Sequence, residues 1–124
     1  MQNTTQSVQK TVLVVDDDDA IREVLTMVLE SEGYRVITAK DGKDGLECLQ
    51  TESPAVVLLD NLMPVMDGCE FMRAMDGLPD YRHIPVFSFS ANARNPFEDT
   101  EIAGYIPKPF RVDDLLSMIG PYLQ

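Results

Sequence analysis

Short apolar runs that alternate with amphipathic segments are the feature of this sequence that most constrains its fold. Five runs are predicted strands: TVLVV (11–15), RVITA (35–39), AVVLLD (55–60), IPVFSFS (84–90) and AGYIP (103–107). The first and third are apolar almost throughout, as in strands that are buried on both faces of a parallel sheet. Strand–helix alternation of this kind predicts an α/β domain whose parallel sheet carries helices on both faces.

Helical periodicity fills the intervals between these runs. After the first strand, apolar residues recur at i, i+3, i+4, i+7 and i+8, as on one face of a helix: Ile21, Val24, Leu25, Val28 and Leu29. Gly33 should end this helix. Further helices are predicted after Asp41-Gly42, around residues 71–75 and over residues 112–119.

Composition excludes several classes of function. The 124 residues suffice for one domain, which we expect to span residues 11–124 behind a flexible polar tail of residues 1–10. A formal net charge of −11 argues against direct nucleic-acid binding, which depends on lysine and arginine neutralising phosphates. No apolar run approaches the ~20 residues of a membrane span, and the two cysteines form no CxxC pair. These features predict a cytoplasmic domain with reduced thiols and no membrane insertion.

Acidic and polar side chains lie where the predicted strands end. Asp16 and Asp17 follow the first strand, Asp60 ends the third, Ser90 ends the fourth, and Lys108 follows the fifth. In open parallel sheets, ligands bind outside the carboxyl ends of the strands, at the point where the strand order reverses. If the first and third strands are neighbours there, the sequence predicts that these side chains share one crevice.

The next two acidic residues have a different expected role. Asp18 and Asp19 lie at the start of the first predicted helix, where an acidic side chain caps free N–H groups and meets the positive end of the helix dipole. Taken alone, the whole acidic run could be a solvated loop with helix-capping residues. The matching residues at the other strand ends favour a binding site.

Three converging carboxylates need a counterion. A hard divalent cation is the natural one, and Mg²⁺ held by carboxylates characteristically completes its shell with water and a substrate phosphate. A lysine that binds phosphate and a serine hydroxyl that donates a hydrogen bond then indicate phosphoryl transfer. An aspartate can itself act as the nucleophile and form an acyl phosphate.

Four segments resemble the receiver domains of two-component response regulators, in the single-domain form of the chemotaxis regulators: VLVVDDDDAIR (12–22), LLDNLMPVMDG (58–68), FSFSA (87–91) and GYIPKPF (104–110). The resemblance implies a flavodoxin-like, doubly wound, five-stranded parallel sheet in the order 2-1-3-4-5. It implies a phosphoacceptor that takes a phosphoryl group from a sensor histidine kinase or phosphotransfer protein and switches the interaction with a downstream protein. Such a domain is no enzyme beyond catalysing its own phosphorylation and dephosphorylation.

The resemblance also implies roles for single residues. Asp60 corresponds to the phosphoacceptor, and Asp16 and Asp17 to the acidic pair that holds Mg²⁺, with Asp17 the direct ligand. Asp60 and the backbone carbonyl of Leu62 would complete the protein ligands of the metal. Ser90 matches the switch hydroxyl that moves toward the phosphoryl group.

Three further matches surround the fifth strand. Lys108 corresponds to the lysine that pairs with the phosphoryl group, and Pro109 to the family's cis-proline. Tyr105 falls at the aromatic switch position, although a tyrosine at a strand end can also serve packing alone. His83 is expected to be an ordinary loop histidine.

Two other classes of function remain open at this point. Aspartyl phosphatases of the haloacid dehalogenase type also combine carboxylates after a first strand with Mg²⁺ and a lysine. Their DxDxT pattern is missing, because Asp16 is followed by three aspartates and an alanine, and the chain has little room for their cap insertions. The second alternative is a pseudo-receiver that binds partners without phosphorylation. The sequence leaves open whether the domain stands alone or belongs to a longer chain.

The interval between the fourth and fifth strands departs from the family pattern. Residues 92–107 must supply both the fifth strand and any helix before it. If the strand takes about five residues, about eleven remain, whereas a parallel crossover normally needs a dozen or more. A capping-like pattern opens at Asn95. We therefore predict a fourth helix of about two turns at most, from Pro96 to Ile102, or none. Gly120-Pro121 should end or kink the last helix.

Overall fold

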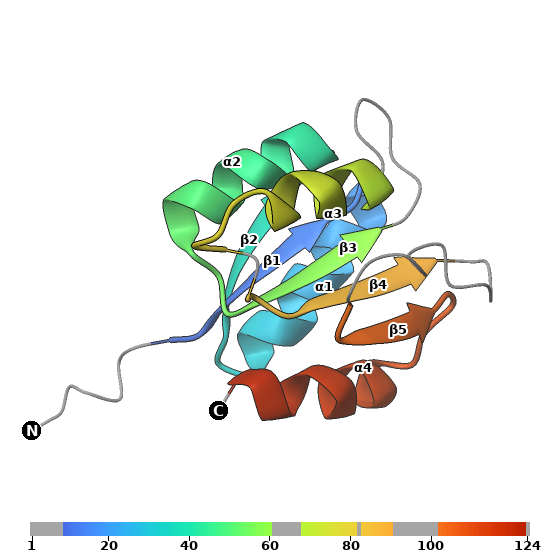
Figure 1. The fold of residues 1–124 in the computed structure, drawn as a ribbon. Coiled ribbons are helices and arrows are strands. Elements are labelled where there is room, and N and C mark those ends of the chain that lie inside the picture. The colour runs from blue at the N-terminus through green and yellow to red at the C-terminus, as the bar shows by residue number, and fades with distance from the viewer. Residues whose placement is uncertain (1–8, 61–67, 82, 91–101, 124) are drawn as a thin grey trace, which may run out of the picture.

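The structure is a computed structural model of the chain that describes residues 9–60, 68–81, 83–90 and 102–123. Its centre is a sheet with the strand order β2-β1-β3-β4-β5 (Figure 1). The strands are β1 (Thr11–Val15), β2 (Arg35–Ala39), β3 (Val56–Asp60), β4 (Val86–Ser90) and β5 (Gly104–Pro107). Every neighbouring pair is parallel, so the predicted doubly wound sheet and its strand order are confirmed.

Helices cover both faces of this sheet (Figure 1). They are α1 (Asp19–Ser31), α2 (Gly42–Glu52), α3 (Gly68–Asp76) and α4 (Val112–Ile119), and α4 continues into a 3-10 helix, η2 (Gly120–Leu123). α1 and α4 pack against one face, whereas α2 and α3 pack against the other. This two-sided covering is what the uniformly apolar central strands require.

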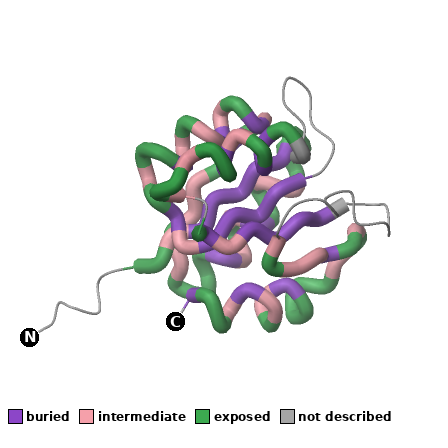
Figure 2. Tube along the Cα trace, in the orientation of Figure 1, coloured by how far each residue is buried: buried purple, intermediate pink, exposed green. Residues whose placement is uncertain are grey.

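Alternate residues of β1 feed two separate cores. Leu13 and Val15 belong to the core beneath α2 and α3, whereas Val12 and Val14 belong to the core beneath α1 and α4. All five residues of β3 are buried, and buried residues run along the central strands of the sheet (Figure 2). Because β1 and β3 are fixed on both faces, the residues at their carboxyl ends stand on a rigid base.

Gly33 and Gly45 are among the glycines whose positions a side chain would disturb. Gly33 adopts a φ of 92° just after α1, which is consistent with the predicted helix stop. Gly45 lies in α2, where an added Cβ would stand 3.0 Å from Val15 Cγ2 and 3.1 Å from Phe71 Cε1. The absence of a side chain there lets α2 approach β1 closely.

One residue assigned to the apolar face of the first helix is not buried. Leu25 and Leu29 are buried in the core, but the side chain of Val24 is 46% exposed. At 3.6 residues per turn, Val24 lies about 120° around the helix from the midpoint between those leucines. The apolar stripe of α1 is therefore narrower than the sequence pattern suggested.

The last helix ends where the sequence predicted. α4 stops at Ile119, and Gly120-Pro121 begins the 3-10 turn η2. The described residues contain four α-helices, which is consistent with a shortened or missing helix between β4 and β5. The predicted segment itself, Pro96 to Ile102, falls outside the described residues except for Ile102. Among the described residues, no helix has the length and apolar character needed to cross a membrane.

Candidate functional site

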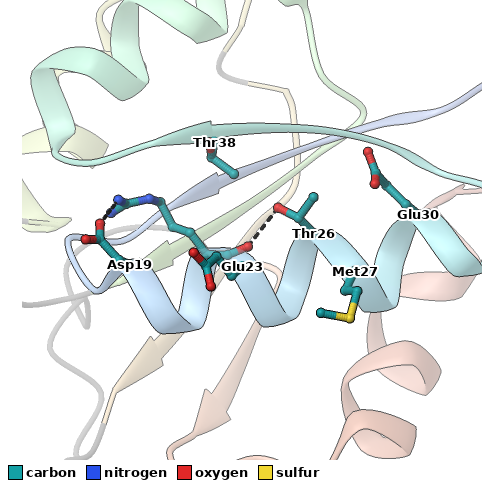
Figure 3. A pocket seen from close by; sticks show the side chains of 7 residues that line it. Asp19, Glu23, Thr26, Met27, Glu30 and Thr38 are labelled. Carbon is teal, nitrogen blue, oxygen red and sulfur yellow. Dashed lines mark hydrogen bonds and ion pairs between the residues drawn. The ribbon is translucent and has the colours of Figure 1, made fainter.

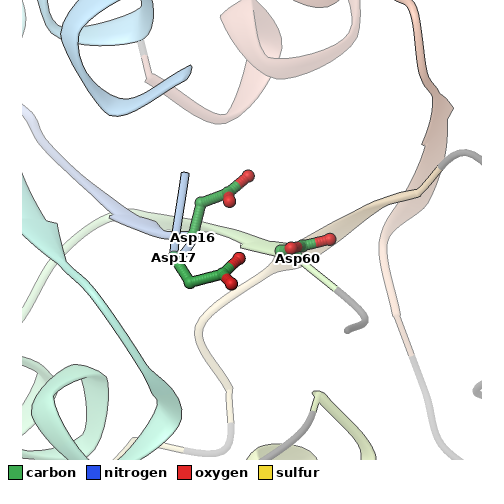
Figure 4. Close-up of side chains that lie close together, drawn as sticks. All are labelled: Asp16, Asp17 and Asp60. Carbon is green, nitrogen blue, oxygen red and sulfur yellow. The ribbon is translucent and has the colours of Figure 1, made fainter. Parts of the chain in front are cut away.

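Three carboxylates meet at the carboxyl ends of β1 and β3. Asp16 and Asp17 follow β1, Asp60 ends β3, and one carboxylate oxygen of each lies within 4.8 Å of the others (Figure 4). They come together because β1 and β3 are hydrogen-bonded neighbours, with Val15 opposite Leu59. Asp16 is fully buried, and Asp60 is 6% exposed. Asp17 is exposed, so the cluster opens to solvent on its side.

Every polar group of the buried Asp16 has a partner. One carboxylate oxygen accepts a hydrogen bond from the backbone N–H of Asp18 at 2.8 Å, and the other lies 3.2 Å from Nζ of Lys108. The backbone N–H donates to the carbonyl of Ala39 at 3.1 Å, and the backbone carbonyl accepts from Nη1 of Arg22 at 2.6 Å. A buried charge is tolerable only when it is paired and hydrogen-bonded in this way.

Lys108 supplies the cation of the site. Its Nζ lies 3.2 Å from Asp16 Oδ2 and 3.5 Å from Asp60 Oδ1, and it stands 4.9 Å from the ring centroid of Phe89. The side chain is 19% exposed. The following peptide bond, Lys108-Pro109, is cis, as the resemblance implied. The ammonium therefore links the carboxylates of β1 and β3 across the end of the sheet.

The charges at this site do not balance. The three carboxylates of the cluster carry −3 against +1 on Lys108, so these four side chains leave an excess of −2. Like charges at such short range repel unless a cation joins them. A grouping of carboxylate oxygens beside solvent is the donor set that hard divalent cations prefer. The residues present therefore fit a divalent cation.

The N-terminus of α1 lies next to the cluster. Asp18 caps the helix, because its side chain accepts hydrogen bonds from the N–H groups of Ala20 at 2.9 Å and Ile21 at 3.4 Å. Asp19 lies in the first turn and forms an ion pair with Arg22. Asp18 and Asp19 thus occupy the helix-start positions that the sequence predicted, whereas Asp16 and Asp17 lie in the carboxylate cluster. The sequence did not predict the contact of Arg22 with the Asp16 backbone. The i,i+3 spacing of Asp19 and Arg22 is the one signal that pointed to Arg22, because it favours their ion pair.

The other predicted site residues are less fully described. Ser90 ends β4 at the same edge of the sheet, but its side chain is outside the described part of the chain, as is all of Leu62. Tyr105 is half-buried in β5, opposite Ser88 of β4. Its hydroxyl is buried and has no hydrogen-bond partner among the described residues.

Several residues outside the cluster have ordinary structural roles. His83 is exposed near the start of β4, and Met72 and Met75 are buried in the core beneath α2 and α3. Cys48 is partly buried in α2. Burial and the nearby carboxylates of Asp44, Glu52 and Glu47 raise the pKa of its thiol.

Comparison with known proteins defines the class. The family model for the response regulator receiver domain matches residues 12–120. The chain belongs to this family, whose members are signalling domains and not in general catalytic enzymes. The resemblance drawn from the sequence is thereby confirmed, and the comparisons give no support to the haloacid dehalogenase alternative.

Named relatives agree with this assignment. Response regulator MprA of Mycolicibacterium vanbaalenii and that of Mycobacterium tuberculosis are each 36% identical to this chain over 115 residues, which cover 91% of this chain and 50% of the relative. The chain thus spans about half the length of the curated relatives it matches.

Solved structures agree on the fold. Chemotaxis response regulator CheY4 of Vibrio cholerae superimposes with a TM-score of 0.85 at 30% identity, over 94% of this chain and 100% of that chain. The N-terminal domain of a response regulator receiver protein from Methanoculleus marisnigri superimposes with a TM-score of 0.74 at 39% identity, over 90% of this chain and 94% of that chain. The receiver domain of a sensor histidine kinase from Pseudomonas aeruginosa superimposes with a TM-score of 0.84 at 24% identity, over 93% of this chain and 98% of that chain. That structure has a magnesium ion coordinated in its active site cleft.

Proposed function

We propose that this receiver domain accepts a phosphoryl group on Asp60, in the presence of Mg²⁺, from a phosphohistidine of a sensor kinase or phosphotransfer protein. The observation that carries the proposal is the grouping of three carboxylates within 4.8 Å of one another, with the ammonium of Lys108 bridging two of them. Asp60 is the member of this group that stands on the central strand β3.

The metal role of the cluster is supported by its charge and donor chemistry. Asp17, the exposed carboxylate, would be the direct ligand, and Asp60 and the backbone carbonyl of Leu62 would complete the protein ligands. Asp16 is buried and engaged with Lys108, so it would act through the water shell of the ion. When bound, Mg²⁺ would supply positive charge to the oxygens of the incoming phosphoryl group. The magnesium reported for the Pseudomonas aeruginosa receiver domain is consistent with this role.

The chemical step is a direct transfer between two residues. A carboxylate oxygen of Asp60 attacks phosphorus, the P–N bond of the phosphohistidine breaks, and the imidazole nitrogen keeps the electron pair. The product is an acyl phosphate on Asp60. Lys108, which lies 3.5 Å from Asp60 Oδ1, then pairs with an oxygen of the bound phosphoryl group. Water that attacks the same phosphorus reverses the switch.

The output of the switch passes through Ser90 and Tyr105. The Ser90 hydroxyl would donate a hydrogen bond to the phosphoryl group from the end of β4. The buried hydroxyl of Tyr105 has no partner within the part of the chain that the structure describes, and a buried hydroxyl left unpaired costs about 1–3 kcal/mol, so a rearrangement that pairs it would be favourable. The two movements together would change the surface that a downstream protein recognises.

The proposed receiver domain consists of residues 11–124, and residues 1–10 form the proposed tail. The proposed location of the protein is the cytoplasm.

Phosphorylation with a small acyl phosphate donor and Mg²⁺ tests this function. Intact-mass spectrometry should reveal one added phosphoryl group on the wild type and on the control Asp80→Asn, which alters an exposed aspartate. Asp60→Asn should remain unmodified, and omission of Mg²⁺ should abolish the reaction. A phosphorylated Asp60→Asn protein would refute the assignment. A wild type that stays unmodified would favour a pseudo-receiver, and one that hydrolyses phosphomonoesters would favour an aspartyl phosphatase.

A further inference from the structure

Arg22 connects the backbone of the acidic cluster to the first turn of α1. Its Nη1 donates to the backbone carbonyl of Asp16 at 2.6 Å, and its Nη2 pairs with the carboxylate of Asp19. The side chain of Arg22 is 19% exposed, while that of Asp19 is 84% exposed. One guanidinium thus spans from a solvated carboxylate to the main chain of a fully buried residue.

The Asp16 carbonyl belongs to the peptide unit that leads into Asp17. The six atoms of a peptide unit are nearly coplanar, so a hydrogen bond that fixes this carbonyl also fixes the N–Cα bond of Asp17. The rest of Asp16 is held by Lys108, by the N–H of Asp18 and by the carbonyl of Ala39. Arg22 therefore adds a constraint on the backbone from which the Asp17 side chain projects toward the cluster.

The backbone of Arg22 in α1 makes two hydrogen bonds that hold the base of its side chain in place. The backbone N–H of Arg22 donates to the carbonyl of Asp18 at 3.1 Å, and its carbonyl accepts from Oγ1 of Thr26 at 2.7 Å. Asp19 and Thr26 line a groove beside β2 that also contains Thr38 (Figure 3). The dashed lines in Figure 3 mark the ion pair at Asp19 and the Thr26 hydrogen bond.

We propose that Arg22 is a positioning residue for the metal site and sets the Mg²⁺ concentration at which the domain works. This inference rests on the proposed function. Partners that orient the ligands of a metal typically contribute about 10- to 100-fold to its affinity. Lysine cannot replace arginine fully, because its single ammonium lacks the planar fork that reaches two acceptors at fixed angles.

The sign of the effect separates positioning from simple charge. Arg22→Met removes a positive charge near the carboxylates, and by Coulomb's law alone this change would strengthen Mg²⁺ binding. Loss of positioning would weaken it. Arg22→Lys keeps the charge and alters only the geometry. Asp19→Asn removes the ion pair but leaves the Asp16 contact available, and Arg35→Met is the matched control, because Arg35 pairs with Glu52 through an exposed contact of 2.8 Å.

Two titrations with Mg²⁺ test the inference. In the first, without a phosphodonor, binding is followed by the NMR shift of the Asp18 amide, which donates to the Asp16 carboxylate. In the second, the rate of phosphorylation is measured against Mg²⁺ at saturating donor. We expect Arg22→Met to raise the half-saturating Mg²⁺ concentration about tenfold and Arg22→Lys about threefold, with the maximal rate reduced about twofold at most. Asp19→Asn and Arg35→Met should stay within about twofold of the wild type.

Each outcome bears on one claim. Mg²⁺ binding to the wild type tests the metal site, and modification of Asp60 tests the proposed function, whereas only the comparison among variants tests Arg22. Equal or tighter Mg²⁺ binding by a folded Arg22→Met protein would overturn the inference. If thermal melting indicates that Arg22→Met does not fold, the folded Arg22→Lys variant decides. A folding defect in Arg22→Lys as well would overturn it, because Arg22 would then serve fold stability.

Discussion

The ammonium of Lys108 lies 3.2 Å from a carboxylate oxygen of Asp16, although the two residues are 92 positions apart in the sequence. The contact joins the end of β1 to the residue after β5. Because Asp16 is fully buried, this lysine is its main charge partner among the described residues.

Replacement of Lys108 by methionine should destabilise the domain in the absence of metal. The buried charge of Asp16 would lose its cation, and breaking a buried pair costs about 3–5 kcal/mol. We expect a smaller loss of about 2 kcal/mol in the free energy of unfolding, because Lys108 is 19% exposed and Asp16 keeps the Asp18 hydrogen bond. Urea unfolding without Mg²⁺ checks this value. An unchanged midpoint would mean that the pair contributes nothing to stability.

Asp60→Asn should have the opposite effect on stability without metal. The change removes one of three crowded carboxylates while Lys108 keeps its contact with Asp16. Relief of the repulsion should raise the free energy of unfolding by about 1 kcal/mol. Added Mg²⁺ should stabilise the wild type more than the variant, because only binding to the folded state adds stability. Thermal melting with and without Mg²⁺ measures both effects, and lower stability of the metal-free variant would contradict the account.

Leu62 is expected to prolong the phosphorylated state. The family resemblance implies that the side chains of Leu62 and Asn92 would flank the path of the hydrolytic water; both residues lie outside the described part of the chain. A leucine cannot hydrogen-bond this water, whereas an asparagine can orient it. Leu62→Asn should therefore lose its phosphoryl group faster than the wild type after the donor is removed. Equal or slower decay, followed by intact-mass spectrometry, would rule the idea out.

The thiol of Cys48 should react slowly at neutral pH. Burial and the carboxylates of Asp44, Glu52 and Glu47 raise its pKa, so less thiolate is present at a given pH than for a free cysteine. In a Cys69→Ser background, alkylation of the folded protein should be slower than in urea and should keep rising with pH above the ordinary thiol range. Alkylation at the rate of an unfolded thiol near pH 7.5 would contradict the raised pKa.

The sequence predicted the strands from short runs rich in β-branched and apolar residues, whether those residues are buried, as in β1, or partly exposed, as in β2. The runs 11–15 and 35–39 match β1 and β2 residue for residue, because β-branched chains next to turn residues leave little choice of boundary. The grouping of Asp16, Asp17 and Asp60 was predicted on the condition that the first and third strands are neighbours, which the family resemblance implied. Val24 shows the limit of such patterns, since spacing defines a face but not which edge of that face meets the core.

Features that depend on three-dimensional reach were not predictable in the same way. The hydrogen bond from Arg22 to the Asp16 carbonyl joins a helix side chain to a main-chain group, and no residue pattern marks such an acceptor. The full burial of Asp16 was equally hidden, because a run of four aspartates is typical of solvated loops. The fourth-helix prediction stays open, since residues 91–101 lie outside the described part of the chain.

The location of the phosphoryl group tests the central claim most directly. After reaction with the donor and Mg²⁺, borohydride reduction converts an aspartyl phosphate to homoserine, and peptide mass spectrometry then identifies the modified position. We expect homoserine at position 60 alone, and none when Mg²⁺ is omitted. Homoserine at position 16 or 17, or at no position in a folded and metal-loaded protein, would contradict this claim.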